Sequence, residues 1–252
     1  MFTEQRARWL YQNYVWLEAN LPARQDGTKA KLILPTAEHF PMRRTGDHAF
    51  AEAVFHRTRE FMGLTDWPCH LMPQEDNEQK AHAAMFDSGA MGYSKGPAGA
   101  AGTFFSDGQG VEITYSPALL HDPVSLISTY AHELSHYLLA TVKTDPPCGW
   151  AEHEPLTDLA AVHEGFGVFL CNGAFTFSQW GNNKTQGWQS SRRGYLNEAE
   201  LGFATGIFCV RSGITPETIG PHLKPNPREV FWDSLDYIAG LNNPPSNVNL
   251  KF

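Results

Sequence analysis

Cysteine is scarce in this sequence and poorly spaced for cross-linking or metal binding. Its 252 residues include four cysteines, at positions 69, 148, 171 and 209, and no two of them form a Cys-x-x-Cys pair. Disulfide frameworks and cysteine-built zinc sites use closely spaced cysteines. The spacing argues against both, and we interpret Cys69, Cys148, Cys171 and Cys209 as mostly buried free thiols.

Two further absences concern membranes and nucleic acid. The N-terminal stretch lacks the apolar segment and small-residue cleavage site of a signal peptide, and the longest apolar stretches, 126–142 and 159–175, are interrupted by His, Glu and Gly. Lysine and arginine total 19 against 27 aspartates and glutamates, a net charge of −8, and no basic run occurs. A nucleic-acid surface needs clustered positive charge. We therefore expect a cytoplasmic protein that binds neither membrane nor nucleic acid.

The sequence does contain enough apolar residues for a core, together with an excess of histidine. Hydrophobic residues make up 42% of the chain and charged residues 18%, which is typical of a folded globular protein, and there are 11 histidines. A chain of this length forms one domain, or one domain with a small subdomain. An acidic domain has no evident structural need for so many histidines, so the excess indicates that some of them belong to a functional site.

Apolar periodicity and capping residues predict helices and strands in the first half of the chain and mainly helices in the second. Expected helices cover 3–21, 47–62, 123–142, 155–170, 196–211 and 227–239, and expected strands cover 31–35, 67–72, 102–105 and 110–115. Glycines between 88 and 110 predict turns, and 178–194 a polar loop. We expect a single α+β domain over 1–252. Its α/β part, 1–122, has a small mixed sheet with 110–115 as an edge strand, and its mainly helical part is 123–252.

A metal-binding motif lies in the expected helix 123–142. Residues 132–136 are His-Glu-Leu-Ser-His, an HExxH pattern. Residues four apart on a helix lie about 40° apart around its axis, so both imidazoles can reach one zinc ion. Glu133 then projects beside them, where it can serve a water molecule as a general base.

A catalytic zinc site needs a third protein ligand. The HExxHxxGxxH continuation of the metzincins is absent, because Leu139 and Val142 occupy the positions of its glycine and third histidine. Downstream, Glu154 and Asp158 lie one helical turn apart at the start of the next expected helix. The spacing favours Glu154 as the ligand, with Asp158 accepting the remaining ring N–H of a ligand histidine.

Other residues compete for these two roles. Asp158 itself, Glu152, His153 and His163 are alternative third ligands. Asp158 can also be a simple partner of the positive helix N-terminus.

The pattern HExxH followed by Glu154-x-x-Thr157-Asp158 resembles the gluzincins, the thermolysin-like zinc metallopeptidases. The resemblance covers 132–158 and implies a zincin-like fold with one zinc ion on His132, His136 and Glu154. It further implies Glu133 as general base and Asp158 as the support of a ligand histidine. The chain departs from the larger peptidases at His153, where they have asparagine, and at Pro155. Residues 157–170 also resemble small bacterial proteins of unassigned role that carry an HExxH domain.

These observations predict a zinc-dependent peptidase or amidohydrolase that acts on a peptide or protein substrate. The strand 110–115 would pair with an extended substrate above the metal. By residue type, Tyr195 and Arg193, and also His163 and His222, are candidate donors to the oxyanion. Two alternatives remain: a zincin-derived regulatory or binding domain that holds zinc without catalysis, and a purely structural role for the two motif histidines.

Overall fold

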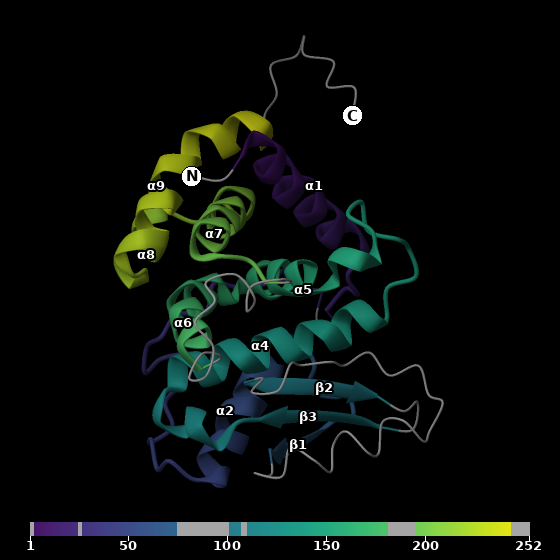
Figure 1. The fold of residues 1–252 in the computed structure, drawn as a ribbon, viewed down its shortest axis with the longest axis vertical. Helices are drawn as coiled ribbons and strands as arrows, with labels where there is room; N and C mark the ends of the chain where they lie inside the picture. Colours follow the sequence, from purple (N-terminus) through teal and green to yellow (C-terminus); the bar gives the residue numbers. More distant parts are fainter. Residues whose placement is uncertain (1–2, 25–26, 75–100, 107–109, 181–194, 243–252) are drawn as a thin grey trace.

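The computed structural model describes residues 3–24, 27–74, 101–106, 110–180 and 195–242. Within these residues the chain has a mixed α+β fold that is mostly helical and includes a small three-stranded sheet (Figure 1). The sheet and one helix, α2, form one end of the molecule, and the other helices are stacked above them. The α+β class and the small mixed sheet expected from the sequence are confirmed.

The described elements follow the order helix, helix, three strands, then helices to the end. The helices are α1 (Glu4–Asn20), α2 (His48–Phe61), α4 (Pro123–Ala140), α5 (His153–Ala161), α6 (Gly167–Trp180), α7 (Glu198–Ser212), α8 (Pro216–Ile219) and α9 (Pro225–Asn242), and the strands are β1 (His70–Pro73), β2 (Gly102–Ser106) and β3 (Val111–Tyr115). No helix in this part of the chain is long and apolar enough to cross a membrane. The glycines at 89–99, residues 181–194 of the predicted loop and the tail from 243 lie outside the described residues, whereas 178–180 belong to α6.

Several helices begin at side chains that cap their first turn. The Thr3 hydroxyl accepts a hydrogen bond from the backbone N–H of Arg6, and the Asp47 carboxylate accepts one from Phe50 (2.9 Å). Asn197 and Glu200 form a reciprocal capping box at the start of α7. Each cap satisfies N–H groups that the first helical turn leaves open. These local signals explain why α1, α2 and α7 lie close to their predicted ranges.

The strand order corrects the prediction that residues 110–115 form an edge strand. The sheet runs β1-β3-β2, with β3 parallel to β1 and antiparallel to β2. The strand predicted at the edge is therefore the central strand. Val111, Ile113 and Tyr115 are buried while Glu112 is exposed, so β3 turns one face to the core. Such alternation shows which face is buried but not which strands lie alongside, because pairing involves distant residues.

The predicted strand 31–35 and the continuous helix 155–170 are both wrong, and their errors share a cause. Residues 27–34 form neither helix nor strand, and the N–H of Ile33 donates to the carbonyl of Gly165 (3.0 Å). Gly165 lies in a π-helical turn, Val162–Phe166, with a φ of 97°, and this turn separates α5 from α6. A Cβ at Gly165 would lie 1.9 Å from the carbonyl oxygen of Lys31. Only glycine, which has no Cβ, lets residues 27–34 pass so close to the π turn.

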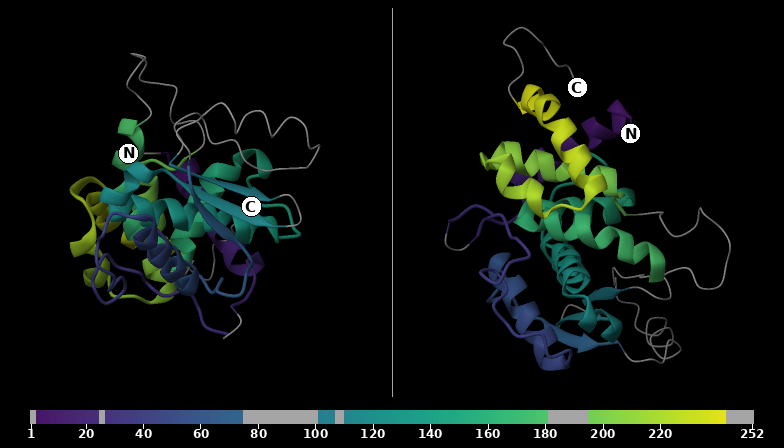
Figure 2. Two further views of the ribbon diagram at one scale, coloured as in Figure 1. Left: turned by 90° about the horizontal axis from the view of Figure 1, so that it is seen from below. Right: turned by 90° about the vertical axis from the view of Figure 1, so that its left-hand side faces the viewer.

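Helix α4 lies at the centre of the molecule. It contacts β2 and β3 on one side, and α2, α5 and α6 on others (Figures 1 and 2). Helix α1, although it belongs to the first 122 residues, packs on α5 and α7 instead of the sheet. Ion pairs Arg6–Glu200 (2.6 Å) and Arg211–Glu18 (2.5 Å) join it to α7. Helix α1, which the predicted boundary at residue 122 assigns to the α/β part, thus contacts helices of the other part.

Candidate metal centre

Three side chains converge between α4 and α5, which lie side by side in Figure 1. The Nε2 atoms of His132 and His136 are 3.0 Å apart. The Oε2 atom of Glu154 lies 3.3 Å from Nε2 of His132 and 3.7 Å from Nε2 of His136. One ligand atom of each residue thus lies within 4.8 Å of the other two. These three residues, termed the His–His–Glu cluster below, are the ones the sequence predicted as metal ligands.

Local structure explains how Glu154 reaches the two histidines. A short 3₁₀ turn, Trp150–Glu152, leads directly into α5, so that Glu154 lies in the first turn of this helix. Pro155 occupies the same turn, where a missing N–H breaks no helical hydrogen bond. The departure from the gluzincin pattern at Pro155 therefore leaves the helix intact.

Asp158 joins two parts of the site. Its Oδ1 lies 2.8 Å from Nδ1 of His132, and its Oδ2 accepts a hydrogen bond from the backbone N–H of Leu196 (2.9 Å). The residue is 6% exposed. Because an ionised carboxylate only accepts hydrogen bonds, Nδ1 of His132 carries the proton and Nε2 faces the cluster. Asp158 thus contacts the motif histidine that it was predicted to support.

His153, an alternative third ligand by sequence, makes a different contact in the structure. Its Nε2 lies 2.8 Å from Nδ1 of His136, on the ring edge that faces away from the cluster. Thr157 Oγ1 lies 3.3 Å from the same Nδ1. The available signal was the one-turn spacing of 153 and 157 on α5, next to a predicted ligand.

The charges of the cluster favour a cation. Burial alone lowers the pKa of His132, but the neighbouring carboxylates of Asp158 and Glu154 outweigh it and raise that pKa well above its usual value. Burial and the neighbouring His132 hold the pKa of His136 well below its usual value. Burial opposes ionisation of Glu154, yet the adjacent His132 lowers its pKa. In the metal-free protein, His132 therefore carries a proton on both ring nitrogens, and this imidazolium supplies the positive charge beside the Glu154 carboxylate.

The donor atoms also fit a metal ion. Oε2 of Glu154 is buried, and no described group is aligned to donate a hydrogen bond to it. It faces the Nε2 edges of two imidazoles at 3.3 and 3.7 Å. Two imidazoles and one carboxylate are a ligand set of catalytic zinc sites. The residues present are thus suited to zinc.

Glu133 and strand β2 lie against each other beside the cluster. Glu133 is buried, and its pKa is raised to about 7, chiefly by burial. Glu154 and Asp158 raise it further, whereas His132 opposes them. A Cβ at Gly102 would lie 3.3 Å from Cγ of Glu133, so the absence of a side chain there lets β2 approach.

The same strand reaches the second motif histidine. The ring of Phe104 stacks near that of His136, with centroids 6.1 Å apart. The strand next to the cluster is therefore β2, not β3.

Of the four predicted oxyanion donors, Tyr195 lies at the cluster. Its ring centroid is 5.3 Å from that of His132. Burial and the carboxylates of Glu154 and Glu133 raise its pKa, so the hydroxyl keeps its proton, although 40% of the residue is exposed. His163 instead contacts Glu164 in the π turn (3.0 Å), and Arg193 lies outside the described residues.

His222, the fourth of these residues, lies in the short turn Gly220–His222. Its carbonyl accepts a hydrogen bond from Asn172 (2.7 Å), and among the described residues it makes no contact with the cluster.

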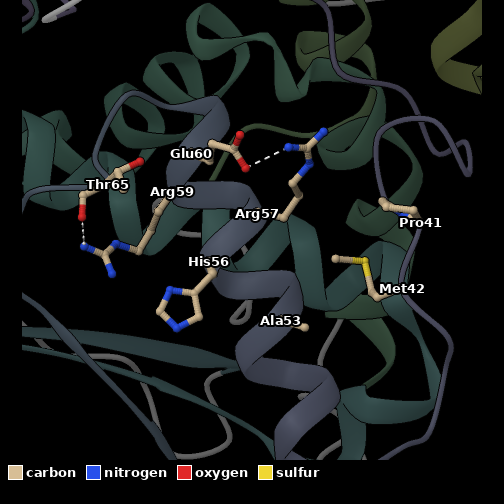
Figure 3. A pocket seen from close by; sticks show the side chains of 8 residues that line it. All are labelled: Pro41, Met42, Ala53, His56, Arg57, Arg59, Glu60 and Thr65. Carbon is tan, nitrogen blue, oxygen red and sulfur yellow. Dashed lines mark hydrogen bonds and ion pairs between the residues drawn. The ribbon is translucent and has the colours of Figure 1, made fainter.

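A pocket of about 460 Å³ lies elsewhere, on the outer side of α2 (Figure 3). Both of its arginines already contact neighbouring groups. Arg57 contacts Glu60 (2.7 Å), and Arg59 donates to the carbonyl of Thr65 (2.9 Å). No residue of the His–His–Glu cluster lines this pocket. We therefore place the candidate site at the cluster.

Comparison of the chain with protein-family models, with curated proteins and with solved structures gave no match. The proposals that follow therefore depend on the sequence motif and on the geometry described above.

Proposed function

We propose that this protein is a zinc-dependent metallopeptidase, or a closely related amidohydrolase, with a gluzincin-type site. The observation that carries the proposal is the convergence of His132, His136 and Glu154, two from an HExxH motif and one from the following helix, with their ligand atoms within 4.8 Å. The proposal includes a zincin-like fold. An HExxH helix that packs on a small mixed sheet supports it.

His132, His136 and Glu154 would hold one zinc ion. Bound there, zinc would supply Lewis acidity, which lowers the pKa of a water molecule and polarises the carbonyl to be attacked. Asp158 would hold His132 with Nε2 directed at the metal through the 2.8 Å contact at Nδ1.

Glu133 and Tyr195 would serve the reaction directly. Glu133 lies among His132, Glu154 and Asp158, close enough for each to shift its pKa. It would take the proton of the attacking water and later deliver it to the leaving amine. Tyr195 keeps its hydroxyl proton and would donate a hydrogen bond to the carbonyl oxygen as negative charge develops there.

The substrate would lie along β2. This strand pairs with β3 on one side only among the described residues, and it approaches Glu133 at Gly102 and His136 at Phe104. An extended peptide can add to a free sheet edge through backbone hydrogen bonds. The strand assigned to substrate binding is thus β2 instead of 110–115.

The test is Glu133→Gln, which keeps the size of the side chain and removes the base. With zinc content measured and equal in both proteins, hydrolysis of fluorescence-quenched peptides of mixed sequence is expected to fall by at least about 100-fold. Glu152→Gln is the matched control, because Glu152 is exposed and lies two residues before the glutamate ligand. It should retain the wild-type rate.

Two results would count against the proposal. A Glu133→Gln protein that cleaves at the wild-type rate with equal zinc removes the proposed base. A wild-type protein that binds one zinc ion but cleaves no peptide favours the non-catalytic zinc-binding domain instead.

A further inference from the structure

His153 makes a contact that the proposed chemistry leaves unused. It lies at the start of α5, one residue before Glu154, and its Nε2 is 2.8 Å from Nδ1 of His136. This Nε2 is directed at the edge of the His136 ring that faces away from the cluster, and His153 is not among the residues whose ligand atoms converge there. Its contact is therefore with His136.

The neighbouring Thr157 determines the direction of this hydrogen bond. Its hydroxyl donates to the backbone carbonyl of His153 (2.9 Å), so its one proton is used there. Towards Nδ1 of His136, 3.3 Å away, the hydroxyl offers only a lone pair. Because this lone pair faces Nδ1 of His136, that nitrogen carries the proton. Nε2 of His153 then accepts the hydrogen bond from Nδ1–H of His136.

We propose that His153 is a positioning residue that fixes His136 in its Nδ1-protonated tautomer and thereby presents the Nε2 lone pair to the metal. A neutral imidazole can carry its proton on either nitrogen, and the form protonated at Nε2 cannot bind a metal through that atom. An acceptor at Nδ1 removes this choice and makes Nε2 a better ligand. The inference rests on the proposed zinc site.

The two motif histidines are supported in chemically different ways. Asp158 supports His132 with a carboxylate, at 2.8 Å, and His153 supports His136 with an imidazole at the same distance. Both supports and the ligand Glu154 come from α5. A single helix would thus supply one ligand and orient the other two.

The experiment compares His153→Gln with His153→Met. These side chains have similar length, but only glutamine offers a strong acceptor near the position of Nε2. Zinc affinity is measured by competition with a chromophoric chelator. We expect His153→Met to bind zinc about 10- to 100-fold more weakly than the wild type, and His153→Gln to recover most of that loss. Equal affinities for the wild type and His153→Met, or equal losses in both variants, would overturn the inference.

A second measurement needs no metal. Long-range ¹H–¹⁵N spectra of the zinc-free protein report which ring nitrogen of His136 is protonated. We expect Nδ1 protonation in the wild type and a shift towards Nε2 protonation in His153→Met. If the wild type fails to bind zinc, the proposed function fails, while these spectra still decide the role of His153. An Nε2-protonated His136 in the wild type would contradict it.

Discussion

Asp158 has two partners, and each of its oxygens serves one of them. Oδ1 accepts from His132, and Oδ2 accepts from the backbone N–H of Leu196. The second contact fixes the residue that follows Tyr195, so one carboxylate orients a predicted ligand and the start of the segment with the predicted oxyanion donor. A plain partner of the helix dipole would have neither contact.

This double contact gives a prediction for Asp158→Asn. The amide can still accept from His132 through its oxygen, but its NH₂ group then faces the N–H of Leu196, so one contact is lost. We expect zinc affinity to fall about 10- to 100-fold, measured by chelator competition. Asp66→Asn, an exposed substitution in the turn after α2, is the control and should bind zinc as the wild type does. An unchanged affinity in Asp158→Asn would show that the carboxylate does not support His132.

At the scale of single residues, the sequence could predict which side chains lie together when they belong to the same helix. His132, Glu133 and His136 lie within two turns of one helix, and helical spacing alone brings the two imidazoles together. Glu154 and Asp158 could be placed relative to each other for the same reason. The contact of His153 with His136 depends on how α5 packs on α4, which the one-turn spacing of 153 and 157 indicates only in part.

At the scale of elements, the π turn Val162–Phe166 determines how residues 27–34 cross the helices. The carbonyl of Gly165 accepts from Ile33, and the space of a Cβ at Gly165 is filled by the carbonyl of Lys31. The segment therefore satisfies a backbone donor without joining the sheet. The sequence indicated an extended segment at 31–35, but its partner is more than 130 residues away, which explains the wrong strand.

Gly165→Ala tests this crossing. Alanine at a φ of 97° is strained and its Cβ would meet the Lys31 carbonyl oxygen at 1.9 Å, so one segment must move. We expect the free energy of unfolding, from urea titration, to fall by about 2–5 kcal/mol. Gly213→Ala is the matched control. Its φ is 64°, but no atom lies within 4 Å of the added Cβ, so it carries the strain without the clash. Equal losses in the two variants would show that the clash is relieved at no cost.

At the scale of the whole molecule, a largely buried ion pair between Arg24 and Glu164 joins the α2 end to the helical part. Arg24 donates to the carbonyl of Phe61, at the end of α2, and its other nitrogen contacts Oε2 of Glu164 in the π turn (2.5 Å). His163 lies 3.0 Å from the other oxygen of Glu164, and the ring of Tyr14 packs near His163. The group lies away from the His–His–Glu cluster and has no part in the proposed chemistry.

The Glu164 carboxylate makes the stability of the molecule depend on pH. Burial alone would raise its pKa, but the hydrogen bond and charge of His163 and the charge of Arg24 lower it overall. Because the folded pKa lies below the unfolded value of about 4.3, the stabilisation is complete above that value. It is lost as the pH falls through the folded pKa, since the unfolded chain takes up the proton first. We expect the free energy of unfolding of the zinc-free protein to decrease below about pH 4.5.

Glu164→Gln and the double variant Arg24→Met/Glu164→Gln separate this group from the other carboxylates that titrate in acid. At about pH 6, Glu164→Gln leaves the guanidinium of Arg24 buried without its ion-pair partner and should lose about 3–5 kcal/mol, measured by urea unfolding. The double variant should recover much of that loss, because neither charge remains. Both should show a shallower decrease in stability with falling pH than the wild type, since glutamine does not titrate. Equal slopes in all three proteins would mean that the Arg24–Glu164 pair does not couple folding to pH.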